Sequence, residues 1–149
     1  YEGGVYALNA DNGARAWSNT FVRGASEIYL WEQAAHPSRR GGPDVPARKL
    51  LIVSTGTTGL WAIEPETGNE VWHRAIPSGG ASRATPILGV LMFSTTRQGI
   101  YLLSPLDGRV IDGIHTGEGF SMPPATYGER AFIVSNAGRF YSLRVEPPI

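Results

Sequence analysis

The sequence is long enough for one ordinary domain, carries balanced charge and contains no cysteine. Its 149 residues can bury a sizeable core, and 13 basic and 13 acidic residues give a formal net charge of zero. A neutral chain has no electrostatic footprint for nucleic acid or an anionic membrane surface. The lack of cysteine excludes disulfides and zinc–thiolate sites, and no apolar run is long enough to span a bilayer. We therefore expect neither a nucleic-acid partner nor a membrane-spanning segment.

The residue types favour strands over helices. Nineteen glycines and 11 prolines supply the turns that many short strands require. No stretch keeps the i, i+3, i+4 apolar spacing of an amphipathic helix for long. We expect an all-β chain.

The N-terminal segment is typical of two strands joined by a tight turn. Residues 4–9 have apolar positions on both faces, as a strand packed on two sides would. Asp11-Asn12-Gly13 closes the turn, with the glycine at a position of positive φ. Residues 14–21 form the outer strand, from which Trp17 packs between sheets.

An insertion interrupts the pattern after the next strand. Residues 24–31 resemble the inner strand of a sheet, and residues 32–48 that follow are rich in proline, glycine and arginine. Such a loop cannot bury its own backbone, so we expect it on the surface, at one mouth of the fold.

From Lys49 onward the strands come at regular intervals. With the inner strand at 24–31, two complete groups of strands and one incomplete group are expected: 24–31, 50–54, 59–63 and 70–75; then 84–88, 90–94, 99–103 and 109–114; then 122–125, 131–135 and 138–144.

One pattern recurs along the chain, in which a glycine opens a strand, a second glycine closes a turn and a tryptophan follows. A period near 40 residues with strand-like content indicates β-propeller blades of four antiparallel strands. The opening glycines are Gly4, Gly59, Gly99 and Gly138, of which the last three are 40 and 39 residues apart; the turn glycines are Gly13, Gly68 and Gly108; the tryptophans are Trp17 and Trp72.

This reading gives two full blades and two partial blades, one at each end. We take 1–149 as one partial propeller with 32–48 inserted in it. Exposed sheet faces at the ends would leave apolar surface uncovered. We therefore expect the rest of the ring to come from another chain, a cleaved partner or sequence beyond this segment. The alternative is that the two partial ends meet and close a small ring.

The repeat resembles that of the pyrroloquinoline-quinone-like (PQQ-like) propeller family over nearly the whole chain outside the insertion. The matching positions are Gly4, Ala7, Leu8, Gly13 and Trp17, and again Gly59, Ala62, Ile63, Gly68 and Trp72; Gly99, Leu102, Leu103 and Gly108 match in part, with Ile111 near the tryptophan position.

The resemblance implies one of two groups. Quinoprotein alcohol and sugar dehydrogenases hold the quinone beside a Ca²⁺ at the propeller centre, often under a vicinal disulfide. Non-enzymatic members include the accessory lipoprotein of the outer-membrane β-barrel assembly machinery and the sensor domains of some bacterial kinases. In these, the propeller is a platform for partners.

The residues give the dehydrogenase little support. A calcium site needs converging oxygen ligands, and the four candidate acids all lie in or beside the repeat turn, where such residues cap turns for local reasons. A vicinal disulfide is excluded because cysteine is absent. We expect no cofactor, no metal and no catalytic residue. The candidate acids are Asp11, Glu64, Glu66 and Asp107.

The histidines and the strand-end serines also give no support for a metal site or a catalytic nucleophile. His36, His73 and His115 are far apart and lack metal-ligand spacing. Ser54, Ser94 and Ser135 end the second strands of their blades, where equivalence across blades indicates a hydrogen bond at the strand end instead of a nucleophile.

The aromatic residues divide into core and candidate contact residues. Tyr6, Trp61 and Tyr101 share one repeat position and are predicted core residues. Beside and within the insertion lie Tyr29, Trp31, Arg39 and Arg40, residue types that are enriched at interface hot spots. We expect these four to bind a partner, against the alternative of a solvated, mobile loop.

The sequence thus favours a non-catalytic scaffold that binds proteins, with a protein partner or second chain completing the propeller. The resemblance implies a periplasmic or other extracytoplasmic bacterial location, with membrane association through a missing N-terminal segment. The alternatives are a fragment of a PQQ-dependent dehydrogenase and the sensor domain of a bacterial receptor.

Overall fold

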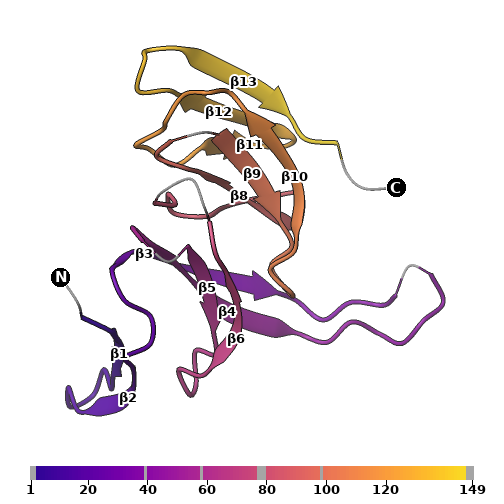
Figure 1. Cartoon of the computed structure of the whole chain (residues 1–149). Coiled ribbons are helices and arrows are strands. Elements are labelled where there is room, and N and C mark those ends of the chain that lie inside the picture. Colours follow the sequence, from indigo (N-terminus) through magenta and orange to yellow (C-terminus); the bar gives the residue numbers. More distant parts are fainter. Residues whose placement is uncertain (1–2, 39, 58, 77–79, 98, 147–149) are drawn as a thin grey trace.

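The computed structural model describes residues 3–38, 40–57, 59–76, 80–97 and 99–146, and in these ranges the regular structure is all β. Four antiparallel sheets follow one another in chain order, from β1–β2 near the N-terminus to β11–β13 near the C-terminus (Figure 1). Two sheets have four strands, one has three and one has two, which is the incomplete propeller that the repeat predicted.

The strands keep chain order within each sheet. The first sheet holds β1 (Val5–Leu8) and β2 (Arg15–Asn19); the second, β3 (Ala25–Gln33), β4 (Arg48–Thr55), β5 (Leu60–Ile63) and β6 (Glu70–Arg74); the third, β7 (Thr85–Ile87), β8 (Val90–Ser94), β9 (Gly99–Leu103) and β10 (Val110–His115); the fourth, β11 (Ala125–Tyr127), β12 (Arg130–Val134) and β13 (Phe140–Arg144).

The opening glycines lie where a strand passes very close to the outer strand of its own sheet. A Cβ on Gly4, Gly59 or Gly99 would lie 2.2 to 2.3 Å from a carbonyl oxygen of that strand, which real Cβ atoms cannot do. Any other residue there would force the two strands apart.

Gly138 does not belong to this set, although the sequence pattern predicts that it opens a strand as Gly4, Gly59 and Gly99 do. Phe140 pairs with Val134 in the way that Ile100 pairs with Ser94, so Arg139 occupies the place of Gly99. Gly138 has a φ of 84°, and nothing lies within 4 Å of a Cβ built on it. The repeat is therefore 40 residues long at both intervals, and the fourth sheet carries a large side chain at the glycine position.

The turn glycines make room for the tryptophans of the preceding sheet. A Cβ on Gly68 would lie 2.3 Å from the Trp17 ring, and one on Gly108 would lie 2.5 Å from the Trp72 ring. Both glycines also have φ values of 72° to 74°, which disfavour any side chain. Gly13 has the same φ and no neighbour within 4 Å of a Cβ.

The apolar core lies between neighbouring sheets in three clusters, one for each junction. The first sheet packs on the second through Val5, Val22, Val53, Trp61 and Ile63. The second packs on the third through residues such as Leu50, Ile52 and Phe93, and the third packs on the fourth through residues such as Met92, Phe120 and Ile133.

Two of the three aromatic predictions for the core hold. Trp61 is buried and Tyr101 is partly buried against the cluster between the second and third sheets. Tyr6 is 48% exposed, contrary to the prediction, because it faces away from the second sheet and no described sheet covers that side. The Arg15 guanidinium lies over its ring, 4.8 Å from the centroid.

Two of the three strand-end serines connect neighbouring sheets. Ser54 Oγ donates to the carbonyl of Ser82 at 2.6 Å, and Ser94 Oγ donates to that of Met122 at 2.9 Å. Ser135 lies one repeat position later, and its Oγ accepts the Arg139 N–H at 3.1 Å. All three have the structural hydrogen bonds of a strand end, although Ser135 is not equivalent to the other two.

Candidate partner-binding site

An arm, described at residues 34–38 and 40–47, extends the hairpin of β3 and β4 away from the second sheet. Figure 1 shows it as the long purple loop projecting past the sheets. The strands themselves continue to Gln33 and begin again at Arg48, so the insertion is shorter at each end than the sequence predicted. The third sheet joins its two equivalent strands through Leu88 and Gly89 alone.

The arm keeps an antiparallel geometry beyond the end of the sheet. His36 and Val45 exchange both backbone hydrogen bonds, at 2.9 and 2.8 Å. Nearer the sheet, Gln33 Nε2 donates to the carbonyl of Pro46 at 3.3 Å. These contacts fix the direction of the arm while leaving most of its side chains in solvent.

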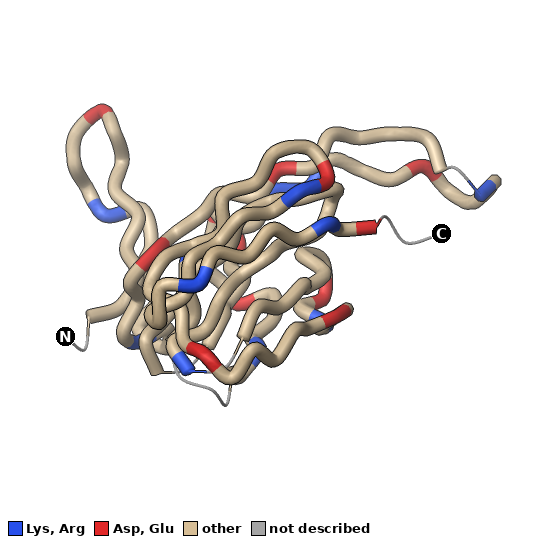
Figure 2. Tube along the Cα trace, turned by 90° about the horizontal axis from the view of Figure 1, so that it is seen from above, with Lys and Arg blue, Asp and Glu red and all other residues tan. Residues whose placement is uncertain are grey.

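The tip of the arm carries polar and charged groups of both signs. Arg40 is exposed, and its backbone N–H donates to Ser38 Oγ at 3.4 Å. Asp44 is exposed nearby, and both signs of charge occur along the arm in Figure 2. Arg39, the fourth residue of the expected contact set, lies outside the described residues.

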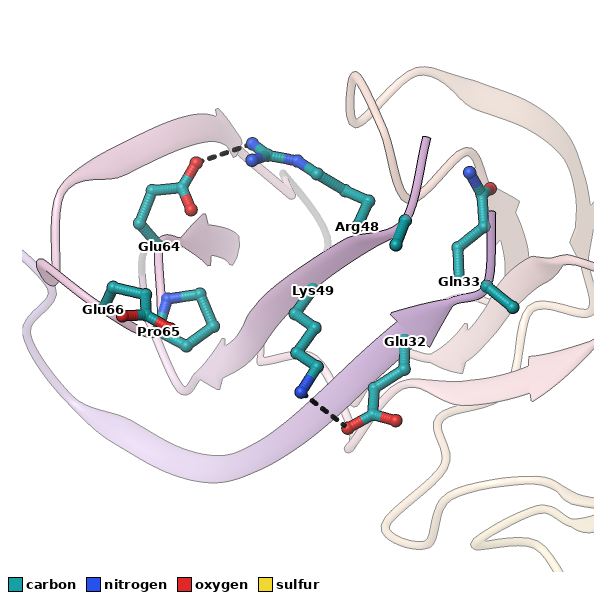
Figure 3. A pocket seen from close by; sticks show the side chains of 9 residues that line it. Glu32, Gln33, Arg48, Lys49, Glu64, Pro65 and Glu66 are labelled. Atoms are coloured by element: carbon teal, nitrogen blue, oxygen red, sulfur yellow. Dashed lines mark ion pairs between the residues drawn. The ribbon is translucent and has the colours of Figure 1, made fainter. Parts of the chain in front are cut away.

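A groove of about 490 Å³ lies at the base of the arm. Its walls are the ends of β3 and β4 and the turn between β5 and β6 (Figure 3). Antiparallel pairing explains this neighbourhood, because the β3–β4 and β5–β6 connections leave the sheet at the same edge. The lining residues are Glu32, Gln33, Ala34, Ala47, Arg48, Lys49, Glu64, Pro65 and Glu66.

Ion pairs hold the charged groups on opposite walls of this groove. Arg48 Nη2 lies 2.7 Å from Glu64 Oε1, and Lys49 Nζ lies 4.0 Å from Glu32 Oε1 (Figure 3). Glu66, on the β5–β6 turn, adds a third carboxylate to the same wall as Glu64. The groove therefore combines two ion pairs with one further carboxylate, which suits a polar segment of a partner.

Trp31 does not lie on the surface where a partner was expected to bind. Its side chain is only 6% exposed and lies in the core cluster between the second and third sheets, because β3 continues past it and turns it inward. Tyr29, two residues earlier on the same face, is partly buried against that cluster. Burial, and to a lesser degree the charge of Glu32, raises the pKa of the Tyr29 hydroxyl. Of the three expected contact residues that the structure describes, Arg40 is exposed, Tyr29 is half-buried and Trp31 is buried.

The groove residues on the β5–β6 turn were not among the expected contact residues. Glu64 and Glu66 were weighed only as calcium ligands, although antiparallel pairing places that turn beside the insertion. The pairing of β5 with β4 and β6 would have placed this turn beside the insertion.

The acidic residues of the repeat turns make local contacts. Asp107 Oδ1 accepts the backbone N–H of Arg109 at 3.0 Å, which lowers the pKa of the carboxyl, and Glu64 pairs with Arg48. Within the part of the chain that the structure describes, no three His, Asp or Glu side chains come close enough together to hold a metal ion.

The histidines are likewise separate. His36 is exposed on the arm, His73 stacks on Trp61 with ring centroids 3.9 Å apart, and His115 meets the edge of Tyr101. Each has a local packing or surface role in a different part of the fold.

The repeat, its sheets and its junctions match a known family. Residues 1–146 match the family described as outer membrane protein assembly factor BamB. The chain belongs to the BamB family. The crystal structure of BamB from Moraxella catarrhalis has a similar fold, with a TM-score of 0.61 and 19% sequence identity over 96% of this chain.

This BamB-family chain spans 39% of the length of the Moraxella protein. No curated protein matches its sequence. The family takes its description from an assembly factor, and the PQQ-like repeat also occurs in quinoprotein dehydrogenases. The described residues include no helix long and apolar enough to cross a bilayer.

Proposed function

We propose that this chain is part of a non-catalytic propeller scaffold that binds protein partners during outer-membrane protein assembly. The observation that supports the proposal is the arm, whose described residues 34–38 and 40–47 project as an exposed hairpin from the second sheet. Loops held on a rigid scaffold are where binding residues concentrate. Its partner surface consists of the arm tip around Arg40 and the charged groove at its base.

The compartment and the completed ring follow from the same proposal. We place the proposed scaffold in the periplasm at the outer membrane, with partners that take part in outer-membrane protein assembly; the family description as an outer membrane protein assembly factor supports this. The partial sheets at the two ends are completed by further blades, from more of the same polypeptide or from a second chain.

A shortened arm tests the binding surface. Gln33 and Arg48 are directly opposite each other, so residues 34–47 can be replaced by Asn-Gly, the preferred two-residue hairpin turn. We expect the circular dichroism spectrum to persist and binding to purified assembly-machinery components to fall at least about tenfold, a loss of 1.4 kcal/mol. Unchanged binding by a folded shortened variant would contradict the proposed surface.

Site-specific photocrosslinking in the bacterial periplasm provides a second test. A photoreactive residue at Asp44, on the arm, should give an adduct with an outer-membrane assembly component, identified by mass spectrometry. The matched control is Asn12, which is also an exposed turn residue but lies on the first sheet. Equal adducts from both positions would point to non-specific contact.

A further inference from the structure

A pocket of about 220 Å³ lies at the junction of the second and third sheets, beside their edge strands β6 and β10. Ala75 and Ile76 line it directly after β6, and Val110 lines it from the start of β10. Ile76 packs against the core cluster of this junction, while the Val110 side chain is 43% exposed. Both sheets have all four strands, so the pocket does not depend on the partial sheets at either end of the chain.

Phe93, Tyr101 and His115 give the pocket an aromatic wall on the third sheet. The rings of Phe93 and Tyr101 are stacked with centroids 5.6 Å apart, and the His115 ring meets the edge of Tyr101 at 5.4 Å. The Tyr101 hydroxyl lies 3.5 Å from His115 Nδ1. Aromatic rings prefer such offset and edge-on contacts with further rings, and each pair gains energy beyond the area that it buries. The wall therefore favours an aromatic side chain over an aliphatic one.

The second sheet places two rings where the third sheet places one. Trp61 on β5 is opposite His73 on β6, and their rings stack with centroids 3.9 Å apart. The equivalent pair on the third sheet is Tyr101 and Gly113. A Cβ on Gly113 would lie 2.6 Å from the Tyr101 ring, so this ring lies directly on the backbone of β10. In this pair, the stacked ring of the second sheet has no counterpart on the third.

Arg74 brings a positive charge to the pocket that the packing of the sheets does not require. Its Nε donates to the carbonyl of Gly108 at 2.7 Å. At the preceding junction, strand pairing makes Asn19 the equivalent residue, and its Nδ2 donates to the equivalent carbonyl of Gly68 at 2.8 Å. A short, neutral side chain is therefore sufficient for this hydrogen bond, and the charge of Arg74 is left for another role.

The terminal nitrogens of Arg74 can meet an anion. The ion pairs among the described residues do not include Arg74, and the described side chains that line the pocket include no carboxylate. Arg74 is half-buried, and its bond to Gly108 holds the guanidinium at the pocket. A guanidinium held in this way can still donate two parallel hydrogen bonds to a carboxylate. The pocket therefore combines an aromatic wall with a positive charge.

We propose that this pocket binds a phenylalanine or tyrosine side chain of a partner protein, with an aspartate or glutamate next to it in the partner's sequence. An apolar cavity of about 150 Å³ is large enough for benzene, so a pocket of about 220 Å³ accommodates one such side chain. The ring packs against Tyr101 and Ile76, and the carboxylate pairs with Arg74. The pocket shares no lining residue with the arm or the groove at its base, so either proposal can fail alone.

Three heptapeptides test the site. One has phenylalanine flanked by two aspartates, one has alanine in place of the phenylalanine, and one has lysines in place of the aspartates. Binding is measured by amide chemical-shift changes on the isotope-labelled chain. We expect the first peptide to shift Ile76, Tyr101 and Val110 and to bind at least about tenfold more tightly than the alanine peptide and about threefold more tightly than the lysine peptide. The shortened-arm variant should bind it unchanged.

Arg74→Asn gives the decisive variant, because it removes the charge and supplies the side chain that Asn19 uses for the same hydrogen bond. This variant should bind the aspartate and lysine peptides about equally. The matched control is Arg130→Asn, an exposed arginine at the start of β12, which should keep the preference for aspartate. An unchanged preference in Arg74→Asn would overturn the proposal, as would shifts at His36 and Val45 in place of the pocket or equal binding of the alanine peptide.

Filling the pocket from within supplies a second test that does not involve the charge. Ala75 is exposed and lines the pocket, so Ala75→Phe should leave the circular dichroism spectrum unchanged while its ring occupies the space. We expect binding of the phenylalanine peptide to fall at least about tenfold. Ala10→Phe, at an exposed turn of the first sheet, is the matched control and should bind as the parent chain does. Undiminished binding by a folded Ala75→Phe variant would show that the ring binds elsewhere and would overturn the proposal.

Discussion

The second–third and third–fourth junctions solve one packing problem in different ways. At the first of these, the Trp72 ring lies on Gly108 and its indole donates to Pro105. At the other, Asp112 lies opposite Leu102 in the way that Trp72 lies opposite Ala62, and Glu118, Tyr141 and Arg139 form a polar network. The comparison teaches that a propeller repeat can keep its register after losing its main docking residue.

Trp72→Ala should produce the largest difference between the two junctions. Removing a buried tryptophan typically costs about 3 to 5 kcal/mol of unfolding free energy, because a cavity remains. The equivalent substitution Asp112→Ala should change stability by less than about 0.5 kcal/mol, since the side chain is exposed. Urea unfolding measures both, and similar losses would mean that Asp112 has a structural role that the contacts do not show.

Gly108→Ala should come next. Its Cβ would lie 2.5 Å from the Trp72 ring, and crowding of this kind costs about 1 to 3 kcal/mol in addition to the strain of positive φ. Gly89→Ala is the matched control, because its φ of 80° is also positive and nothing lies within 4 Å of its Cβ. The difference between the two unfolding free energies isolates the contact with the ring, and a zero difference would argue against it.

Leu88→Asn should stabilise the chain by about 1 kcal/mol, because asparagine tolerates the left-handed conformation better than leucine. Leu106→Asn replaces another exposed leucine, which has no positive φ, and should change stability by less than about 0.5 kcal/mol. Thermal and urea unfolding measure both variants. A destabilised Leu88→Asn would show that the side chain contributes more packing than strain.

The polar network of the third–fourth junction should give the smallest effect on stability. It should appear as a change in how the unfolding free energy depends on pH. Tyr141 Oη donates to Glu118 Oε2 at 2.7 Å, and Arg139 Nε lies 3.1 Å from Glu118 Oε1. The hydrogen bond from Tyr141, with help from Ser135 and the Arg139 charge, lowers the pKa of Glu118 below its ordinary value of 4.5.

A lowered folded-state pKa means that the ionised carboxylate stabilises the fold above its unfolded-state pKa. This stabilisation is lost as the pH falls through the folded-state pKa. Glu118→Gln should therefore be less stable than the parent chain at pH 7 and approach it in acid. Urea unfolding midpoints between pH 7 and pH 3 check this, and parallel pH profiles would contradict it.

The sequence was sufficient for the sheets because glycine, turn and tryptophan recur at one spacing. Residues 59–63 and 99–103 were placed within one residue of β5 and β9 for that reason. The predicted repeat was wrong by one residue at Gly138. This glycine lies next to Arg139, which strand pairing places at the position of the repeat glycine. The sequence pattern alone does not show which residues pair across strands.

The candidate site was harder to predict than the fold. Composition identified the insertion, but Trp31 lies in the core because β3 runs on to Gln33 and alternation decides its face. Tyr6 is exposed because the sheet that would cover it is not among the described ones. The sequence pattern puts Ile111 near the tryptophan position, but strand register gives that position to Asp112, because Ile111 is the bulged residue.

The direct pairing of Gln33 with Arg48 has a consequence for how such scaffolds diversify. Because the two strands meet before the arm begins, the length and composition of the connection can change without shifting any residue of the sheet. Each doubling of loop length costs only about 0.6 kcal/mol in closure entropy. New recognition surfaces can therefore be grafted at this corner at little expense to folding, while the blade beneath them keeps its register.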